Sequence, residues 1–213
     1  MKAGERTADK SETVTIRAAA PADASVLREI YAWYVENTAV SFEYAPPSVG
    51  EFRARMENTL KKYPYLAAEA GGELLGYAYA GPFHPRAAYG WCAELSVYLR
   101  RDVRGRGIGR ALYTAAENAL REMGVVNLYA CVASPAREDE YLTHDSERFH
   151  AAMGFERVGV FHSCGYKFGR WYDMVWMEKL IGPHGADQRE VFPFPEIYSD
   201  SRSSFGFLQL PKK

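Results

Sequence analysis

The stretch that decides the fold is Val97–Glu117, with the sequence VYLRRDVRGRGIGRALYTAAE. It leaves an apolar strand, passes through a turn of arginines and glycines, and runs directly into a helical pattern. The first amides of a helix lack partners within the helix, and the helix dipole places partial positive charge at the same end. Glycine lets a ligand approach the backbone closely. We therefore expect this turn to bind phosphate groups.

The spacing of the glycines separates three kinds of phosphate-binding turn. A P-loop requires a lysine after its last glycine, and no lysine follows this turn. A dinucleotide-binding fingerprint, Gly-x-Gly-x-x-Gly, would require glycine at Arg110 or at Leu112, depending on the register, and both positions fail. What remains is Arg-x-x-Gly-x-Gly, from Arg104 to Gly109, placed between a strand and a helix.

This pattern resembles the coenzyme A loop of the GNAT acetyltransferases, which carry Gln/Arg-x-x-Gly-x-Gly/Ala there. The resemblance runs from about residue 14 to residue 180. NTAVSFE, YLAAEAGGELLGYAYAGPF, AELSVYL, HAAMGF and GYKFGRWYDMVWMEK look like the phosphinothricin acetyltransferase branch. It implies a mixed α/β (α+β) GNAT fold, with a central, mostly antiparallel twisted sheet, flanking helices and a splayed strand pair that holds coenzyme A.

Composition and charge limit the class of protein. The chain has 213 residues, of which 47% are hydrophobic, enough for a compact domain with a core. Its 26 basic and 27 acidic residues give a net charge of -1, so we expect neither a nucleic acid nor a membrane surface as partner. Cys92, Cys131 and Cys164 show no Cys-x-x-Cys spacing, and we expect no disulfide and no metal site. Without an apolar leader or a spanning segment, the sequence predicts a cytoplasmic protein.

Strands and helices are expected to alternate along the chain. Ser48 and Glu51 have the spacing of a capping box at the start of a helix. The helix that follows the arginine turn is expected to point Leu112, Ala116 and Leu120 inward, together with Ala119. The sequence predicts strands at 14–19, 93–99, 126–132, 155–161 and 171–180, a hairpin around residues 71–72, and helices from residue 21, after residue 48, over 107–123 and over 146–153.

Three segments are expected. Residues 1–12 form a flexible N-terminus, residues 13–181 the acetyltransferase domain, and residues 182–213 a C-terminal extension. The extension is rich in Pro, Gly and Ser but keeps several aromatic residues. We place it outside the main core, docked on the body or on a second subunit.

Glu94 is the predicted base. Amine acetylation needs a group that removes a proton from the amine. Glu94 lies inside an otherwise apolar strand, on the face opposite Val97 if the strand is regular. A glutamate there resembles the branch's E-S-T-V-Y-V stretch, seen here as ELSVYL. The alternative is an ordinary carboxylate on a solvated edge.

His150 is the predicted acid. In many GNAT enzymes a tyrosine stands four residues before the Gly-Phe that follows this helix, and a histidine there resembles the phosphinothricin branch. An imidazole with an ordinary pKa of about 6.5 can protonate a leaving thiolate whose thiol has a pKa of about 8.5. The alternative is a histidine that only hydrogen-bonds the pantetheine arm or packs in the core, with solvent protonating the thiolate.

The resemblance also implies contacts with acetyl-coenzyme A. Backbone groups of the strand would pair with the pantetheine arm like an added strand, and the turn would bind the diphosphate. Thr143 stands where the family often has asparagine, in an unusually long loop. The predicted contacts are Val97, Tyr98, Leu99, Arg104, Gly105, Arg106, Gly107, Ile108, Gly109, Arg110, Thr143 and Ser146.

One departure from the branch bears on the acceptor. The branch carries histidine in a G-F/Y-K-H-G turn, and this chain has Phe168 there. Either Glu94 suffices for catalysis or the acceptor differs. Lys167, Arg86 and Tyr89 lie on segments that could approach an acceptor carboxylate, although each is individually more typical of a solvated loop charge or a packed ring.

The sequence thus predicts an acetyl-coenzyme A-dependent N-acetyltransferase for a small amino acid or analogue, such as phosphinothricin or methionine sulfoximine. Attack on the thioester is expected to be direct. A route through Cys92 or Cys131 is disfavoured, because apolar neighbours make both look like core residues. The family is often dimeric, which predicts a homodimer. The alternatives are an acetyltransferase for a protein N-terminus or a polyamine, and a non-catalytic coenzyme A-binding module, against which Glu94 argues.

Overall fold

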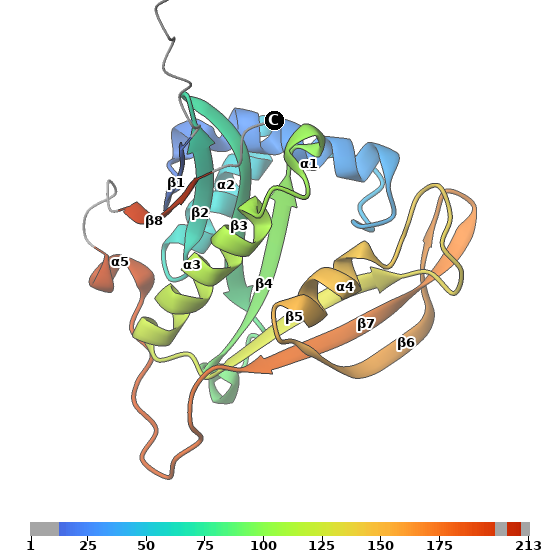
Figure 1. Cartoon of the computed structure of the whole chain (residues 1–213). Coiled ribbons are helices and arrows are strands. Elements are labelled where there is room, and N and C mark those ends of the chain that lie inside the picture. Colours follow the sequence, from blue (N-terminus) through green and yellow to red (C-terminus); the bar gives the residue numbers. More distant parts are fainter. Residues whose placement is uncertain (1–12, 199–203, 210–213) are drawn as a thin grey trace, which may run out of the picture.

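The computed structural model describes residues 13–198 and 204–209, and its centre is one sheet of eight strands (Figure 1). The strand order is β6-β7-β5-β4-β3-β2-β1-β8, and neighbouring strands are antiparallel except for β4 and β5, so the expected mixed, mostly antiparallel sheet is confirmed. The strands are β1 (Thr13–Ala18), β2 (Tyr65–Ala70), β3 (Glu73–Pro82), β4 (Cys92–Leu99), β5 (Asn127–Ser134), β6 (Glu156–Lys167), β7 (Arg170–Leu180) and β8 (Ser204–Gln209).

Strands β4 and β5 separate after a short parallel pairing. Residues 92–94 pair with residues 127–129. Beyond that point β4 continues along β3 as far as Leu99, while β5 continues along β7 as far as Ser134. The two ribbons diverge in Figure 1. The expected splayed pair is therefore present, and it opens directly beyond Glu94.

Helices lie on both faces of the sheet (Figure 1). On β2, Leu66 and Ala68 face the core beneath α3, whereas Tyr65 and Ala67 face the aromatic cluster under α1 and α2. The alternation follows from the two-residue period of a strand covered on both faces. The helices are α1 (Ala24–Asn37), α2 (Val49–Leu60), α3 (Ile108–Met123), α4 (Asp145–Ala152) and α5 (Phe194–Ile197), with single 3₁₀ turns at Pro21–Asp23, Ala87–Tyr89 and Arg101–Val103.

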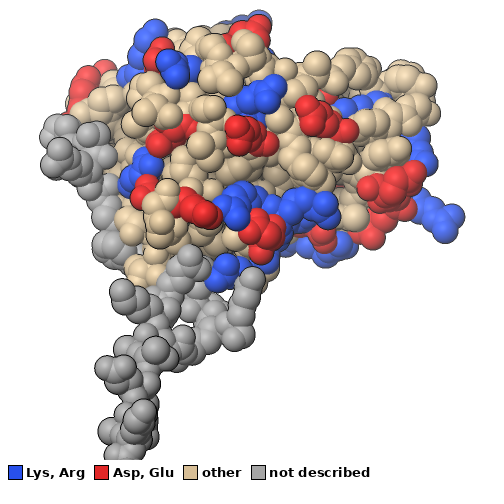
Figure 2. Space-filling view, turned by 90° about the horizontal axis from the view of Figure 1, so that it is seen from above, with Lys and Arg blue, Asp and Glu red and all other residues tan. Residues whose placement is uncertain are grey.

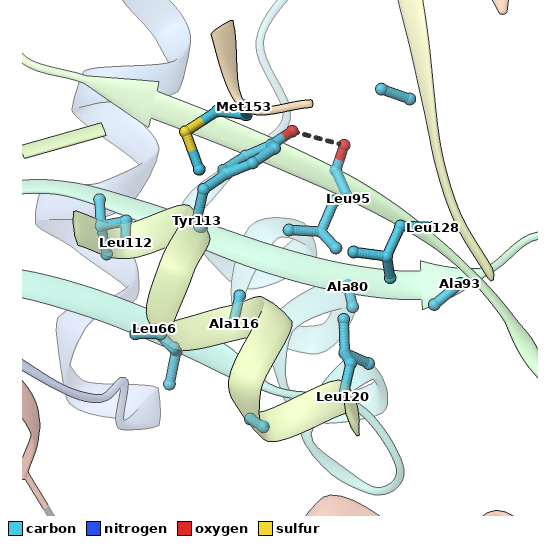
Figure 3. Close-up of a cluster of buried hydrophobic side chains, with 14 of the residues drawn as sticks. Leu66, Ala80, Ala93, Leu95, Leu112, Tyr113, Ala116, Leu120, Leu128 and Met153 are labelled. Atoms are coloured by element: carbon cyan, nitrogen blue, oxygen red, sulfur yellow. Dashed lines mark hydrogen bonds between the residues drawn. The ribbon is translucent and has the colours of Figure 1, made fainter. Parts of the chain in front are cut away.

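Helix α3 forms the centre of the larger core. Leu112, Ala116 and Leu120 are fully buried, as is Ala119, so the predicted inward face is confirmed (Figure 3). The helix begins after Gly107 and ends before Gly124, and both glycines have left-handed backbone. Glycine adopts this conformation at little cost, which explains both boundaries.

The N-termini of α2 and α4 differ in whether the expected serine caps the helix. The capping box before α2 is confirmed: the Ser48 hydroxyl accepts from the Glu51 amide at 3.2 Å, and the Glu51 carboxylate accepts from the Ser48 amide at 2.8 Å. Helix α4 begins at Asp145 after His144, so Ser146 lies within its first turn and is not its cap.

Strand β6 is longer than the sequence predicted. The expectation ended it at Phe161, but pairing with β7 resumes at Gly165 and continues to Lys167. The register shifts between Phe161 and Gly165, and Ser163 has a left-handed backbone. An irregularity of this kind breaks the two-residue alternation from which a strand is recognised.

The C-terminal segment belongs to the fold of this chain. Phe194 is 4% exposed and lies in the larger core, and its amide donates to the Lys62 carbonyl at 2.9 Å. Strand β8 pairs with β1 in antiparallel fashion. Phe194 therefore docks on the body, which is one of the two positions expected for this segment, but it does so within the main core, where the segment was not expected. The expected flexibility of residues 1–12 falls outside the described residues.

Candidate active site

A cavity of about 560 Å³ lies between the arginine-glycine turn, helix α4 and the loop after α1. Its lining includes Val97, Leu99, Arg104, Gly105, Gly107, Gly109, Arg110, Thr143 and Ser146, so most of the predicted cofactor contacts come together in one place. Arg106 and Ile108 are not in this lining. Ile108 is fully buried in the core and offers the site only its amide.

The turn has the backbone of an anion-binding site. Gly105 and Gly107 have φ values of 76° and 83°, which glycine adopts readily. The first intrahelical bond of α3 runs from the Ala111 amide to the Gly107 carbonyl, so the amides of residues 108–110 have no partner within the helix. A Cβ on Gly109 would lie 3.4 Å from Leu99 and Phe149, which shows how closely the turn packs on β4 and α4.

The charges around the turn are mixed. The Arg104 guanidinium lies 3.5 Å from the Asp145 carboxylate of α4. Both side chains are about half exposed, at 49% and 55%, so solvent screens the attraction. Basic and acidic atoms are also interspersed on the face drawn in Figure 2. Part of the charge of Arg104 is therefore offset by Asp145.

In β4, the amide and carbonyl groups of every second residue point toward the gap between β4 and β5. The Arg100 amide donates to the Leu75 carbonyl of β3 at 2.9 Å. Since amide direction alternates along a strand, the backbone of Tyr98 also faces β3, and that of Val97 and Leu99 faces the gap. The Leu99 carbonyl already accepts from the Tyr34 hydroxyl at 2.7 Å. Among the three predicted strand contacts, Val97 is thus best placed to pair with a ligand in the gap.

A smaller cavity of about 60 Å³ lies within the gap itself. Its lining includes Leu95 and Tyr98 of β4, Cys131 of β5, Tyr113 of α3 and His150 of α4. It adjoins the larger cavity, because Val40, Val97 and Ser146 line both. The predicted acid and the predicted cofactor contacts therefore meet at the point where the strands separate.

His150 is 5% exposed and is held at both ring nitrogens. Its Nδ1 lies 2.7 Å from the Ser146 carbonyl, which can only accept, so Nδ1 carries a proton. Its Nε2 lies 2.8 Å from the Tyr113 hydroxyl. Burial lowers the pKa of His150, while the Ser146 bond opposes that shift. The neutral ring therefore dominates at neutral pH.

Tyr113 is a candidate residue that the sequence did not indicate. Tyr113 lines the small cavity, and its hydroxyl lies 2.8 Å from Nε2 of His150. The same hydroxyl lies 3.1 Å from the Leu95 carbonyl, to which it is joined by a dashed line in Figure 3. Burial raises its pKa, so the hydroxyl stays protonated. In the sequence Tyr113 is one more large residue on the buried side of α3, and no motif distinguishes it.

Glu94 occupies the last residue of β4 that pairs with β5, opposite Tyr129. Its side chain is on the face opposite Leu95, away from α3. Burial raises its pKa above the ordinary value. Glu94 is not in the lining of either cavity described above. The Glu94 side chain therefore lies on the face of the sheet that is opposite to α3, next to the point where β4 and β5 separate.

The residues considered for an acceptor carboxylate behave differently from one another. The Lys167 ammonium is 2% exposed and donates to the carbonyls of Val35, Thr38 and Ser41 at 2.7, 2.9 and 2.7 Å, so it is not available to a ligand. Arg86 and Tyr89 are exposed. The structure thus removes Lys167 from the candidates for an acceptor carboxylate.

Phe168 stands at the turn between β6 and β7. Its ring stacks on Tyr141 with centroids 4.2 Å apart, and its backbone is left-handed. Tyr141 lines the larger cavity. Position 168 therefore supports a wall of that cavity.

Cys92 and Cys131 are not core residues, contrary to the expectation. Cys92 is half-buried, and Cys131 and Cys164 are exposed. Tyr129 and Cys131 point away from the core under α3, because Leu128 and Ala130 alternate with them and fill it. Desolvation, with smaller effects of Glu94 and Cys164, raises the pKa of Cys131 to about 12.

A second open cavity, of about 740 Å³, lies beyond Trp33 toward the β2–β3 turn. Its charged side chains already pair with one another: Arg17 with Asp23, and Arg100 with Glu73, each at 2.7 Å. The helix N-terminus and the β4 side of the splayed pair line the 560 Å³ cavity, and β5 lines the adjoining 60 Å³ cavity, so we take these two cavities together as the active site.

Residues 13–198 and 204–209 contain neither a metal-binding cluster nor a membrane-spanning helix. No group of three or more His, Cys, Asp or Glu side chains that could hold a metal ion occurs in these ranges. Nor does this part of the chain contain a helix of the length and apolarity needed to cross a membrane.

Comparison with known proteins decides the family. A family model described as an acetyltransferase (GNAT) domain matches residues 16–176. The chain belongs to the GNAT acetyltransferase family. This GNAT protein is 40% identical over 174 residues to a phosphinothricin N-acetyltransferase of Alcaligenes faecalis, covering 78% of this chain and 82% of that one.

Solved structures of GNAT proteins match this chain closely. A phosphinothricin acetyltransferase of Sinorhizobium meliloti in complex with acetyl-coenzyme A has a TM-score of 0.75 at 32% identity, covering 89% of this chain and 99% of that one. A ribosomal-protein-alanine N-acetyltransferase from Brucella melitensis has a TM-score of 0.71 at 35% identity, covering 78% and 99%. The fold expected from the resemblance is thus confirmed for this GNAT protein.

Proposed function

We propose that this protein is an acetyl-coenzyme A-dependent N-acetyltransferase that acts on the amine of a small amino acid or analogue, of the phosphinothricin or methionine sulfoximine class. The observation that carries the proposal is the splayed β4–β5 pair, which opens beside the arginine-glycine turn. The Alcaligenes relative and the Sinorhizobium structure support the acceptor class and the acetyl donor.

The residues of the larger cavity fit the donor. The amides of residues 108–110 and the glycines of the turn would hold the diphosphate, with Arg104 and Arg110 adding charge. The backbone of Val97 would hydrogen-bond the pantetheine arm, because it faces the gap and has no β5 partner at that point. Thr143 and Ser146 would contact the same arm or the diphosphate from the other wall. Acetyl-coenzyme A supplies the thioester.

Glu94 is the proposed base. It takes a proton from the acceptor's ammonium, directly or through one water. The freed amine then attacks the carbonyl carbon of the thioester, so that the C–N bond forms and the C–S bond breaks. Burial raises the pKa of Glu94, which makes it a stronger base than an ordinary carboxylate.

His150 and Tyr113 are the proposed route of a proton to the sulfur. In its protonated form His150 gives the Nε2 proton to the Tyr113 oxygen, and Tyr113 gives its own proton to the thiolate. The hydroxyl is regenerated and the imidazole becomes neutral. Because burial lowers the pKa of His150, this form is the minor one at neutral pH, and solvent is the competing donor.

Direct transfer is favoured over a route through an acylated cysteine. The thiolate is the nucleophilic form, and a thiol whose pKa is near 12 is almost entirely protonated at neutral pH. Cys131 is therefore poorly suited to take the acetyl group, although it lines the small cavity.

We further propose a cytoplasmic homodimer whose partner molecules are small and include neither nucleic acid nor membrane. The mixed charge of the face in Figure 2 and the net charge of -1 favour small-molecule partners. The free cysteines suit a reducing compartment. Exposed Val158, Phe161 and Trp171 on β6 and β7 provide apolar surface for a second copy.

A second candidate acceptor is a protein N-terminus. The Brucella structure, named for ribosomal-protein alanine, favours it. The N-terminus of a protein substrate could also reach the sheet face around Tyr129, which is half-buried, and Cys131, which is exposed. The two acceptor classes differ in length, so a panel of acceptors separates them.

The test measures the thiol released from acetyl-coenzyme A. Phosphinothricin, methionine sulfoximine, the free amino acids, a polyamine and an alanine-initiated peptide are offered as acceptors. We expect release with the first two, and acetylation of the α-amine confirmed by mass spectrometry. Turnover only with the peptide or the polyamine would establish the alternative acceptor. Tight binding of acetyl-coenzyme A without release by any acceptor would indicate a non-catalytic binding module.

A further inference from the structure

The passage between the two cavities is formed by three residues from three different elements. Val97 comes from β4, Ser146 from α4, and Val40 from the loop that follows α1. The larger cavity contains the phosphate-binding turn, and the smaller one contains His150 and Tyr113. A thioester donor that enters from the turn would bring its acyl end through this passage. Val40 is the apolar side chain that comes from a loop at this point, and not from the sheet or a helix.

The loop that carries Val40 is fixed on both sides of that residue. The Ala39 amide donates to the Tyr141 carbonyl at 3.0 Å. The buried Lys167 ammonium donates to the carbonyls of Thr38 and Ser41, which bracket the valine. A buried ammonium that loses carbonyl partners pays a large desolvation cost, so these bonds hold the loop strongly.

The same loop is locked farther along by packing. The ring of Phe42 lies against the backbone of β6 at Gly165, where an added Cβ would approach it to 2.3 Å. The Tyr44 hydroxyl donates to the Tyr166 carbonyl at 2.7 Å. Three consecutive residues of β6, from 165 to 167, therefore each contact this loop. These contacts fix the backbone of the loop on both sides of Val40.

We propose that Val40 is a specificity-determining residue that closes the acyl end of the coenzyme A site and restricts the donor to acetyl or a similarly short acyl group. This inference rests on the proposed function. Val40 narrows the entrance to a cavity of only about 60 Å³, whose other walls are strand and helix residues that cannot withdraw. A butyryl chain in that space would press against the valine, and the fixed loop could not move aside.

The size of the effect follows from the chemistry of apolar pockets. One methylene in such a pocket changes binding by roughly 10- to 200-fold. Removing two methyl groups from residue 40 is therefore expected to lower the preference for acetyl over butyryl donors by about tenfold, toward the lower end of that range because Val40 is 37% exposed.

The experiment uses binding, so that no acceptor is needed. Dissociation constants of coenzyme A, acetyl-coenzyme A and butyryl-coenzyme A are measured by titration calorimetry on the full chain, on Val40→Ala and on Val40→Phe. In Val40→Ala the preference for acetyl over butyryl should fall about tenfold, with the affinity for free coenzyme A unchanged. In Val40→Phe acetyl-coenzyme A should lose affinity relative to free coenzyme A.

Val49→Ala is the matched control. Val49 is 38% exposed, almost the same as Val40, and lies at the start of α2, outside both cavities. An unchanged acyl preference in Val40→Ala, or the same change in Val49→Ala, would overturn the inference. So would equal affinity of the unaltered protein for the two acyl donors.

Failure of the proposed function gives a different result. If the protein binds no coenzyme A ester, the donor site itself is wrong and the role of Val40 is overturned with it. If it binds the esters with the expected acyl preference but acetylates no acceptor, the acceptor chemistry alone is wrong and the inference about Val40 is supported.

Discussion

At the scale of single residues, the catalytic proposal depends on how the surroundings change two ordinary side chains. Burial raises the pKa of Glu94 and lowers that of His150, because it disfavours the charged form of each side chain relative to the neutral form. The sequence could indicate both residues, because each stands in a recognisable pattern. It could not indicate Tyr113, whose role depends on the angle at which α3 crosses the splayed strands. Nor could it show that Lys167 turns inward, since a lysine in a loop is usually solvated.

Glu94→Gln tests the base. We expect turnover at neutral pH to fall by about 10²- to 10⁴-fold, with the affinity for acetyl-coenzyme A little changed, because the carboxylate acts on the amine. In the unaltered enzyme, activity should fall as the pH drops through the raised pKa of Glu94, since the protonated carboxyl cannot accept a proton. This loss of activity at low pH should be absent from the pH profile of Glu94→Gln. Near-normal turnover would remove Glu94 from the mechanism.

At the scale of elements, the turn and helix α3 were the most predictable part of the molecule. Glycine spacing and the helical pattern are local properties, so residues 104–123 could be interpreted without knowing the rest of the fold. Strand β6 could not, because its irregularity near Ser163 is set by pairing with β7. The cavity walls contributed by the loops around Val40 and Tyr141 also depend on contacts between distant segments.

Gly107→Leu tests the turn. The backbone at Gly107 has a φ of 83°, so a leucine there is strained by about 1–2 kcal/mol. A Cβ on this residue would lie 3.7 Å from the Leu208 side chain, in a turn that lines the cavity. We expect acetyl-coenzyme A to bind at least about tenfold more weakly, measured by calorimetry, because even about 1.4 kcal/mol of lost contact corresponds to that factor.

Gly72→Leu is the control for Gly107→Leu. Gly72 has almost the same backbone, with a φ of 82°, in the turn between β2 and β3 and outside the 560 Å³ cavity. It should lower the midpoint of thermal unfolding to a similar degree and leave cofactor affinity unchanged. Equal loss of affinity in both variants would show that the effect is general strain.

At the scale of the whole molecule, the surprise is the C-terminal segment. Its composition resembles that of a loose extension, yet Phe194 fills the larger core and β8 completes the sheet beside β1. Composition could not reveal this, because the partners lie far away in the sequence: residue 194 bonds to Lys62 and residue 209 pairs with Thr13. The number and sign of the charges, in contrast, were sufficient to exclude a broadly basic protein.

Phe194→Ala tests whether that segment stabilises the body. Phe194 is 4% exposed, and truncation of a buried phenylalanine costs about 3–5 kcal/mol of the free energy of unfolding. Urea unfolding would measure the loss. Phe192→Ala, two residues earlier and 43% exposed, is the control and should change stability much less. A loss in Phe194→Ala no larger than that of the control would show that the segment contributes little.

The pairing of β1 with β8 has a consequence for biosynthesis. Strand β1 is synthesised before both of its neighbours: β2 follows within about fifty residues, but β8 comes only after the other strands of the described sheet. Until residues 204–209 emerge, one side of β1 presents unpaired backbone groups to the solvent, and such an edge recruits other chains. A message truncated just before this point would yield a protein with a nearly complete active site and a tendency to aggregate.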